Sequence, residues 1–275
     1  MVVPSFNACY SCRVIEYVVR PASILNTPRN LADAFKAKLL KYRNGSLVPQ
    51  ITPTWDSTLL LVYPPAECLD AAPDFYPELR DFFAADKCGQ RRRLGKLGIP
   101  VPPTFRWKND AAAYGAAHPG AKYVVRPMRT VRGQGYDVRT DPTNFEEKVQ
   151  FCSRLFPKTR EYRVIFVFGT ALLTIEKRVP PTLSWKDPWN HDNGATFVTI
   201  SGNCSLHQSD FYGRLEGCSI IRHADIVAAD VLWTDDQNAA VEFNSPYLIT
   251  EFNVCPGLGP DNRAKVVEFV NKQTA

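Results

Sequence analysis

The sequence predicts an α+β fold, of α/β type near its start. Short helices and strands are expected, with hydrophobic cores formed against β-sheets. Runs of β-branched and aromatic residues, such as 161–175, alternate with stretches of helical spacing. The chain has 22 prolines against 15 glycines, which favours short elements and stiff turns. Its 275 residues allow more than one domain. We expect an N-terminal region at 1–85 and two α+β subdomains, at 86–156 and 157–275.

The composition is that of a folded chain, with 45% hydrophobic and 22% charged residues. The net charge of +5 is compatible with anionic small molecules or nucleic acid and diagnostic of neither. The longest nearly continuous apolar run, Val164–Ile175, has 12 residues, whereas a membrane-spanning helix needs roughly 20. The amino terminus lacks the pattern of a secretory signal. We therefore expect no membrane partner, a cytoplasmic location, and reduced thiols at the eight cysteines.

Residues 1–85 combine short strands with one helix. Apolar runs at 13–19 and 58–63 indicate strands, and apolar spacing over 31–42 predicts a helix. Cys9 and Cys12 form a single CxxC, which cannot complete a four-ligand zinc site alone. Nothing in this region indicates a reaction.

Residues 86–156 open with a helix and continue with strands. A basic helix is predicted from Asp86 to Leu97, closed by a glycine. Strands are predicted at 122–126 and 136–139, with a glycine-containing loop between them. The stretch 143–156 fits a helix, but its second half fits a strand equally well.

Residues 157–275 are dominated by strands. A strand–turn–strand unit is predicted at 161–175 and two buried strands at 225–233 and 247–254. A polar connection at 235–238 joins the two buried strands, and a closing helix is expected at 262–272.

Several nucleotide and hydrolase motifs are missing from the sequence: it has no GxxxxGK[ST], no GxGxxG after a strand, no HExxH and no GxSxG. The loop between the strands at 122–126 and 136–139 is a candidate phosphate site. Its glycines let backbone N–H groups approach a phosphate, and its arginines add charge. The loop consists of Arg129, Thr130, Val131, Arg132, Gly133, Gln134 and Gly135. An ordinary hairpin loop is the alternative interpretation.

A candidate Mg²⁺ site lies on the last two predicted strands. Glu251 and Asn253 are two residues apart, so both side chains point to one face of their strand. Asp230 supplies a third oxygen donor from inside an apolar run, where an unpaired carboxylate is costly. Mg²⁺ prefers such oxygen ligands and leaves coordination positions for phosphates.

Charged residues also alternate with apolar ones in the preceding strand–turn–strand unit. Glu161 and Arg163 share one face, and Lys177 is on the return strand. The opposite face is expected to carry Val164, Phe166 and Phe168. The cations could face one anionic pocket, or they could form a ladder of cross-strand salt bridges.

In this order the motifs resemble the ATP-grasp superfamily of carboxylate–amine ligases, over about residues 86–260. The resemblance rests on the segments Asp86-Lys87, Val124-Val125-Arg126-Pro127, the loop at 129–135, Glu161-Tyr162-Arg163-Val164, Asn190-His-Asp-Asn193-Gly194, and Glu251-Phe-Asn253-Val-Cys-Pro256-Gly257-Leu258 with Asp230. The Glu-x-Asn-x-x-Pro-Gly-Leu run is the most specific of them. The Glu-Tyr-Arg-Val segment is similar to viral and peptide-ligase members. Arg126 stands where such proteins usually have lysine, and its planar group differs in geometry from an ammonium.

The resemblance implies that ATP binds between the two α+β subdomains, with Mg²⁺ or Mn²⁺ held by Asp230, Glu251 and Asn253. Arg163 and Lys177 would be the catalytic cations. The implied nucleotide contacts are Lys87, Arg126, the loop at 129–135, Asn193, and an adenine-binding segment formed by Arg154, Leu155 and Phe156.

The implied activity is ATP-dependent ligation of a small-molecule or peptide carboxylate to an amine, through an acyl phosphate. Two alternatives stay open. A protein that binds nucleotide without turnover would also account for Arg126. A nucleic-acid binder would use the basic run Arg91-Arg92-Arg93, although such a run is usually a solvated helix face.

Overall fold

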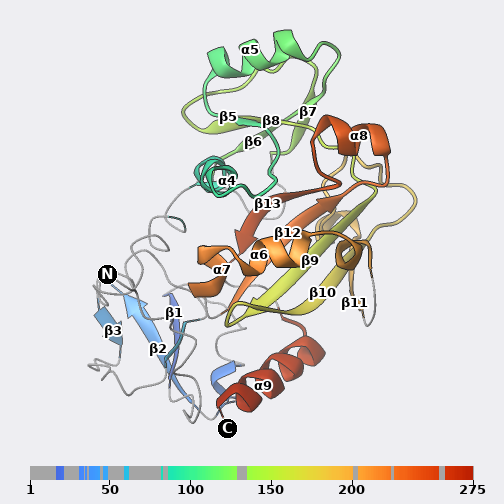
Figure 1. Ribbon diagram of the computed structural model, residues 1–275. Helices are drawn as coiled ribbons and strands as arrows, with labels where there is room; N and C mark the ends of the chain where they lie inside the picture. Colours follow the sequence, from blue (N-terminus) through green and yellow to red (C-terminus); the bar gives the residue numbers. More distant parts are fainter. Residues whose placement is uncertain are drawn as a thin grey trace, which may run out of the picture.

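The computed structural model describes residues 17–21, 31–33, 35, 37–43, 46–48, 59–61, 82, 86–128, 135–200, 204–223, 226–253 and 258–274. The described chain forms three sheets, which Figure 1 shows as a four-stranded sheet near the N-terminus, a second four-stranded sheet under α5, and a five-stranded sheet between them.

The N-terminal sheet has the strand order β3-β2-β1-β4. Its strands are β1 (Tyr17–Pro21), β2 (Lys38–Arg43), β3 (Ser46–Val48) and β4 (Leu59–Leu61). β1 pairs in parallel with both β2 and β4. The predicted helix over 31–42 is therefore wrong in its second half, because residues from Lys38 onward form β2. Pairing with the distant β1 outweighs the local helical spacing.

The second four-stranded sheet, which we call the upper sheet, is antiparallel with the order β5-β8-β6-β7. Its strands are β5 (Thr104–Phe105), β6 (Tyr123–Pro127), β7 (Asp137–Arg139) and β8 (Gln150–Arg154). The predicted strands at 122–126 and 136–139 are confirmed, and the ambiguous stretch ends as the strand β8.

Two helices accompany the upper sheet. The predicted basic helix is confirmed as α4 (Lys87–Lys96), with Asp86 as its N-cap accepting a hydrogen bond from the Gly89 N–H at 2.8 Å. A further helix, α5 (Lys108–Ala117), was not predicted. It covers one face of the sheet through a small core around Ala111, Tyr123 and Cys152.

The five-stranded sheet, which we call the central sheet, is antiparallel with the order β11-β10-β9-β12-β13. Its strands are β9 (Arg160–Val167), β10 (Thr170–Arg178), β11 (Thr196–Ile200), β12 (Ile226–Trp233) and β13 (Tyr247–Asn253). The strands predicted at 161–175, 225–233 and 247–254 are confirmed. The connection at 235–238 is more than a polar turn, since it leads into helix α8 (Gln237–Glu242).

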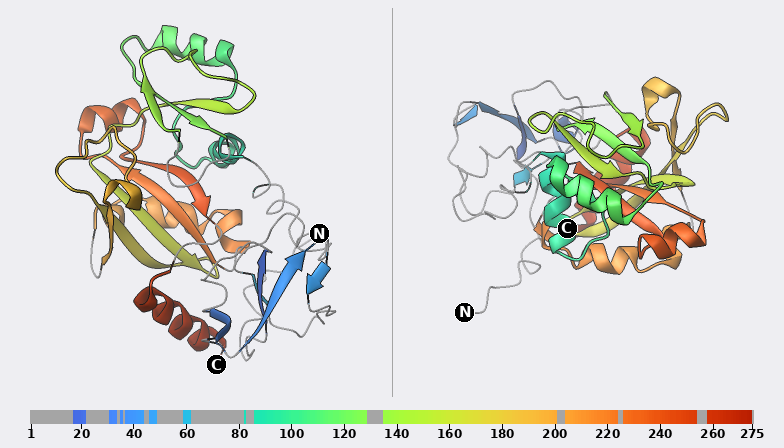
Figure 2. Two further views of the ribbon diagram at one scale, coloured as in Figure 1. Left: turned by 180° about the vertical axis from the view of Figure 1, so that it is seen from behind. Right: turned by 90° about the horizontal axis from the view of Figure 1, so that it is seen from above.

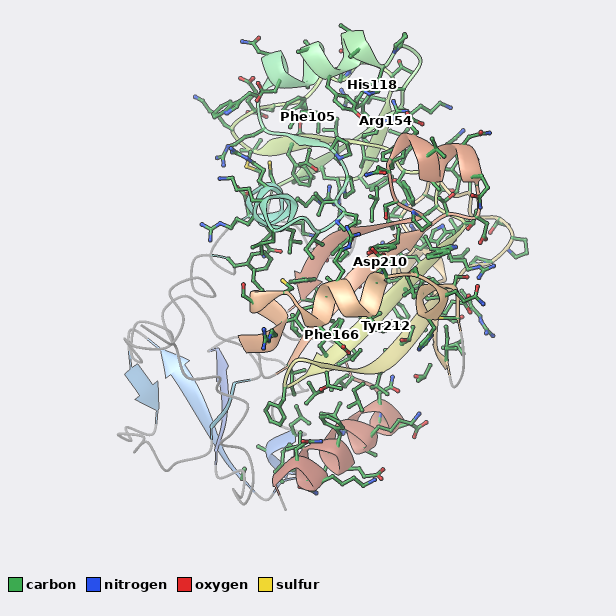
Figure 3. The ribbon with its side chains drawn as sticks, viewed as in Figure 1. Phe105, His118, Arg154, Phe166, Asp210 and Tyr212 are labelled. Carbon is green, nitrogen blue, oxygen red and sulfur yellow. The ribbon has the colours of Figure 1, made fainter. Side chains whose placement is uncertain are left out.

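Helices cover both faces of the central sheet (Figure 2). They are α6 (Phe211–Glu216), α7 (Ser219–His223) and α9 (Pro260–Thr274), the last confirming the closing helix. Short 3₁₀ turns occur at His191–Asn193 and Ser205–Gln208. α6 and α7 pack on the face that includes Phe166, and Figure 3 shows Phe166 and Tyr212 on this side. α9 packs Val266 and Val270 on the opposite face.

The alternation along β9 sorts its side chains as the sequence indicates. Val164 and Phe166 lie in the core under α6, while Ile165 and Val167 lie under α9. The prediction for Phe168 is wrong: it packs against the α9 side. The reason is that Phe168 has a φ of +49° and already belongs to the turn, where strand alternation ends.

Among the described residues, none of the helices combines the length and apolar character that crossing a bilayer requires. Cys88, Cys152, Cys204 and Cys218, the cysteines in the described part of the chain, have free thiols.

Candidate functional site

Ionic side chains gather on one face of the central sheet, beyond the apolar residues that α9 covers. They come from four adjacent strands, β10, β9, β12 and β13, and from α4 beside β13. We call this group the charged cluster. It consists of Lys87, Glu161, Arg163, Lys177, Asp230, Glu251 and Asn253.

Asp230 is at the centre of the cluster and is buried. Arg163 donates to it through both ends of its guanidinium, with Nε 2.7 Å from Oδ1 and Nη2 2.8 Å from Oδ2. Lys177 Nζ lies 3.9 Å from Oδ1. Burial alone would raise the pKa of Asp230, but the nearby cations outweigh it and hold the pKa well below its usual range. Asp230 is therefore ionised at neutral pH.

Glu161 forms the second centre of the cluster, between two lysines. Lys177 donates to its Oε1, and Lys158 Nζ lies 2.9 Å from its Oε2. Burial favours the neutral acid, yet the two ammonium groups lower the pKa of Glu161. The cross-strand salt bridges that the sequence left as an alternative are thus present. Lys158 was not singled out from the sequence, since it precedes β9 and no alternation marks it.

Glu251 and Asn253 complete the cluster from β13. Lys87 Nζ lies 2.7 Å from Glu251 Oε2. Burial works to raise the pKa of Glu251, but Lys87 reverses the effect and lowers it. The Asn253 side-chain amide donates to Asp230 Oδ2 at 2.9 Å and to Glu251 Oε1 at 3.4 Å. One amide therefore bridges the two carboxylates, so the three predicted metal ligands converge.

These three side chains fit a hard divalent cation. Two ionised carboxylates and one amide supply oxygen donors, and the nitrogen and oxygen of the Asn253 amide exchange places on a half-turn. In the described part of the chain, no three residues among His, Cys, Asp and Glu group as a metal site. A donor set of this size suits an ion that takes its remaining ligands from phosphates and water.

Arg126 approaches the cluster from β6 of the upper sheet. Its charge lowers the pKa of Lys87, although burial is the larger cause of that shift. Its Nε atom is buried and has no hydrogen-bond partner among the described residues. A buried donor without a partner is costly, and an anionic ligand would satisfy it.

Only the last residue of the predicted phosphate loop can be placed, because 129–134 lie outside the described residues. Gly135 has a φ of +66°, and a Cβ there would lie 2.7 Å from Pro127 Cγ. Both facts require glycine at this position. In the Pro256-Gly257-Leu258 segment, Leu258 is described and buried against the α9 side.

The structure does not bring the remaining predicted residues to the cluster. The N–H groups of Arg154 and Leu155 donate to Pro103 and Lys122 carbonyls at 2.9 and 2.8 Å. Arg154, labelled in Figure 3, pairs with Glu242 of α8. Phe156 packs edge-on against Phe243. Asn193 holds a local turn, donating to the Pro188 carbonyl at 2.8 Å. Roles for these residues in nucleotide binding stay predictions.

The basic run on α4 is solvated only in part. Arg92 is exposed, but Arg91 is only 2% exposed. Burial lowers the pKa of Arg91 to about 10. Its described hydrogen bonds are made within the protein, so the first of the three arginines is not part of a solvent-facing basic surface.

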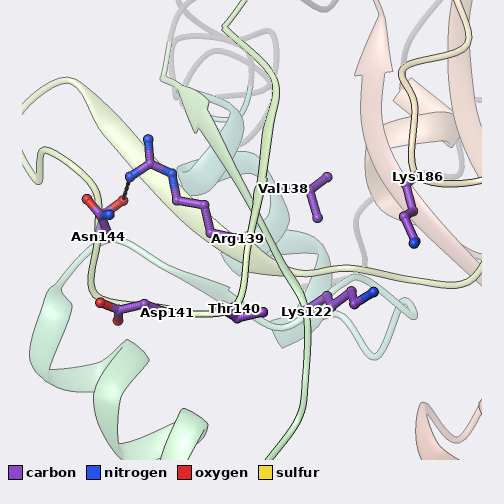
Figure 4. Close-up of a pocket in the computed structure, with 7 residues that line it drawn as sticks. All are labelled: Lys122, Val138, Arg139, Thr140, Asp141, Asn144 and Lys186. Carbon is purple, nitrogen blue, oxygen red and sulfur yellow. Dashed lines mark hydrogen bonds between the residues drawn. The ribbon is translucent and has the colours of Figure 1, made fainter.

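A cavity of about 510 Å³ lies apart from the predicted residues (Figure 4). It is lined by Lys122, Val138, Arg139, Thr140, Asp141, Asn144 and Lys186. Arg139 is engaged with the Asn144 carbonyl at 2.8 Å. None of the predicted site residues lines this cavity, so it does not define the candidate site.

Comparison with solved structures identifies the fold. The chain superposes on D-alanine–D-alanine ligase from Bacillus anthracis with a TM-score of 0.61 and 13% identity, covering 96% of this chain and 97% of that one. The ATP-grasp ligase PsnB, solved with a minimal precursor, gives 0.58 and 11%, covering 95% and 99%. D-cycloserine synthetase DcsG gives 0.58 and 13%, covering 94% and 99%.

The chain has the ATP-grasp fold. The superpositions cover 94–96% of the chain. No protein-family model matches the sequence, and no curated protein is similar to it. The solved neighbours therefore establish the architecture, whereas the chemistry depends on the residues of this chain.

Proposed function

We propose that the protein is an ATP-dependent ligase that joins a carboxylate to an amine. The observation that carries this proposal is the convergence of Asp230, Glu251 and Asn253, bridged by one amide, next to Lys87 of α4 and Arg163 of the central sheet. An ATP-grasp fold is consistent with this assignment. PsnB was solved with Mg and ADP, which agrees with nucleotide and Mg²⁺ as ligands.

The residues have distinct roles in the proposed reaction. Lys87 and Arg126 bind the phosphates of ATP, with the loop at 129–135 completing the phosphate contacts. Asp230, Glu251 and Asn253 hold Mg²⁺, which when bound neutralises charge on the phosphates. Because Lys87 is paired with Glu251, binding of a triphosphate would give this lysine another anionic partner and free Glu251.

The chemistry has two steps. A substrate carboxylate oxygen attacks the γ-phosphorus, the bond to the β–γ bridging oxygen breaks, and ADP leaves. The amine then attacks the carbonyl carbon of the acyl phosphate, phosphate leaves, and the amine loses a proton to give the amide. Arg163 and Lys177 stabilise the negative charge that develops on the transferred group. Both remain protonated at neutral pH, since acidic neighbours raise the pKa of each.

The test is ADP and phosphate formation from ATP and Mg²⁺ with pooled carboxylates and amines, followed by mass spectrometry of the products. We expect Glu251→Gln and Asp230→Asn to lower Mg²⁺-dependent turnover by at least about a hundredfold, because each removes an anionic ligand. Glu268→Gln, at an exposed ion pair on α9, is the control and should keep full turnover.

Wild-type turnover in both site variants would contradict the metal assignment. Mg²⁺-dependent nucleotide binding without phosphate release under any acceptor would instead favour the alternative, a nucleotide-binding protein without turnover.

A further inference from the structure

Strand β13 contains an irregularity at the candidate metal site. Asp230 of β12 faces Glu251, but the next residue, Val231, faces Ile249. Thr250 is thus an extra residue in β13, which makes this a β-bulge. A bulge bends a strand and re-aims the side chains that follow it.

The bulge decides which face Glu251 occupies. Ile249 and Phe252 are three residues apart, yet both lie in the core under α6. In a regular strand, Glu251 would share the face of Ile249 and enter that core. Because of the extra residue, Glu251 and Asn253 instead point to the face that carries Asp230. The metal-ligand set therefore exists only while the bulge is kept.

A bulge leaves backbone groups without partners in the sheet. Here Arg91 of α4 donates from Nε to the Thr250 carbonyl at 2.8 Å. The Arg91 Nη1 atom donates to Ser153 Oγ on β8 at 3.2 Å. Its guanidinium also lies 5.3 Å from the centroid of the Phe151 ring. One side chain thus links α4, β8 of the upper sheet and the bulge of the central sheet.

The cost of burying this side chain argues for a specific role. Arg91 is 2% exposed, and its described hydrogen bonds go to a carbonyl and a hydroxyl, with no carboxylate. Burying a cation without an ion pair is expensive, so stability alone would favour an apolar residue here. Nε and Nη1, two of the three guanidinium nitrogens, are engaged inside the protein, so Arg91 is placed to orient β13.

We propose that Arg91 is a positioning residue that fixes the Thr250 bulge and thereby directs Glu251 and Asn253 toward the divalent cation. This inference rests on the proposed function. It predicts that the Mg²⁺ requirement depends on a side chain that contacts neither the metal nor the nucleotide.

The test compares Arg91→Met and Arg91→Lys with Arg92→Met, the same change at the exposed neighbour. ADP binding is measured by calorimetry over a series of MgCl₂ concentrations. Hydrogen exchange of the peptide covering Tyr247–Asn253 is measured without nucleotide. For Arg91→Met we expect the MgCl₂ concentration for half-maximal gain in ADP affinity to rise at least about tenfold, as for other residues that orient metal ligands. We also expect faster exchange in β13.

Arg91→Lys keeps the charge but cannot reach both acceptors with a planar fork, so we expect the same changes at smaller size. If the Arg91→Met variant does not fold, the inference is tested on Arg91→Lys by the same measurements, the MgCl₂ dependence of ADP binding and the hydrogen exchange of β13. The inference is overturned if the MgCl₂ requirement stays at the wild-type value, even where exchange accelerates, because Arg91 would then be purely structural. If wild-type protein shows no Mg²⁺-dependent ADP binding, the proposed function itself fails, and the two failures are thereby distinguished.

Discussion

Glu161 shows how a single residue can hold several charges in place. It is buried and paired with both Lys158 and Lys177. A buried ion pair contributes little net stability when complete, but removing one member leaves the others unpaired in a poorly solvated place. Glu161 is therefore important chiefly because two buried lysines depend on it.

We expect Glu161→Gln to lower the free energy of unfolding by about 3–5 kcal/mol, measured by urea denaturation at pH 7. The matched control is Glu268→Gln, which breaks the exposed pair with Lys272. Exposed pairs contribute only about 0–1 kcal/mol, so the control should be nearly neutral. Equal effects in the two variants would show that burial does not set the strength of these pairs.

The turn of the β9–β10 hairpin requires a left-handed backbone conformation at two consecutive residues. The chain reverses through Phe168 and Gly169, with φ values of +49° and +79°. A non-glycine residue in this region is strained. A Cβ on Gly169 would also lie 3.4 Å from the Arg222 Cα.

Gly169→Ala should consequently destabilise the protein by about 1–3 kcal/mol in thermal or urea unfolding. Gly213→Ala serves for comparison, because Gly213 lies in α6 and a Cβ there meets nothing within 4 Å. That change should leave the protein unchanged or more stable by up to about 1 kcal/mol. A stable Gly169→Ala variant would contradict the strained turn.

At the scale of the whole molecule, the charged cluster links stability to pH. Glu161, Asp230 and Glu251 all have pKa values below their ordinary range, because nearby cations outweigh the effect of burial. A carboxyl with a lowered folded-state pKa stabilises the fold above its unfolded pKa. That stability is lost as the pH falls through the folded value.

We therefore expect the free energy of unfolding to fall as the pH drops below about 4, the usual carboxyl range. The Asp230→Asn variant should be less stable than the wild type at pH 7, because Arg163 loses its anionic partner. On acidification the variant should lose less stability than the wild type does, with a difference on the order of 2 kcal/mol. Urea denaturation from pH 7 to 2.5 measures both. Parallel curves for the two proteins would show that Asp230 does not contribute to the acid response.

The sequence alone determined the features that depend on local spacing. Side chains alternate along a strand, so Glu161 and Arg163 could be placed opposite Val164 and Phe166, and Glu251 beside Asn253. The basic helical run and the closing glycine placed α4 within a residue at each end. These patterns need no knowledge of distant segments, which is why they hold.

Only the tertiary structure decided what depends on pairing between distant segments. Pairing with β1 made β2 a strand where the spacing predicted a helix. The bulge at Thr250, set by the register with β12, chose the face of Glu251 and Asn253. Burial turned Arg91 from a supposed surface charge into a link between two sheets. Register and burial arise from contacts between residues far apart in the chain, so the local sequence does not contain them.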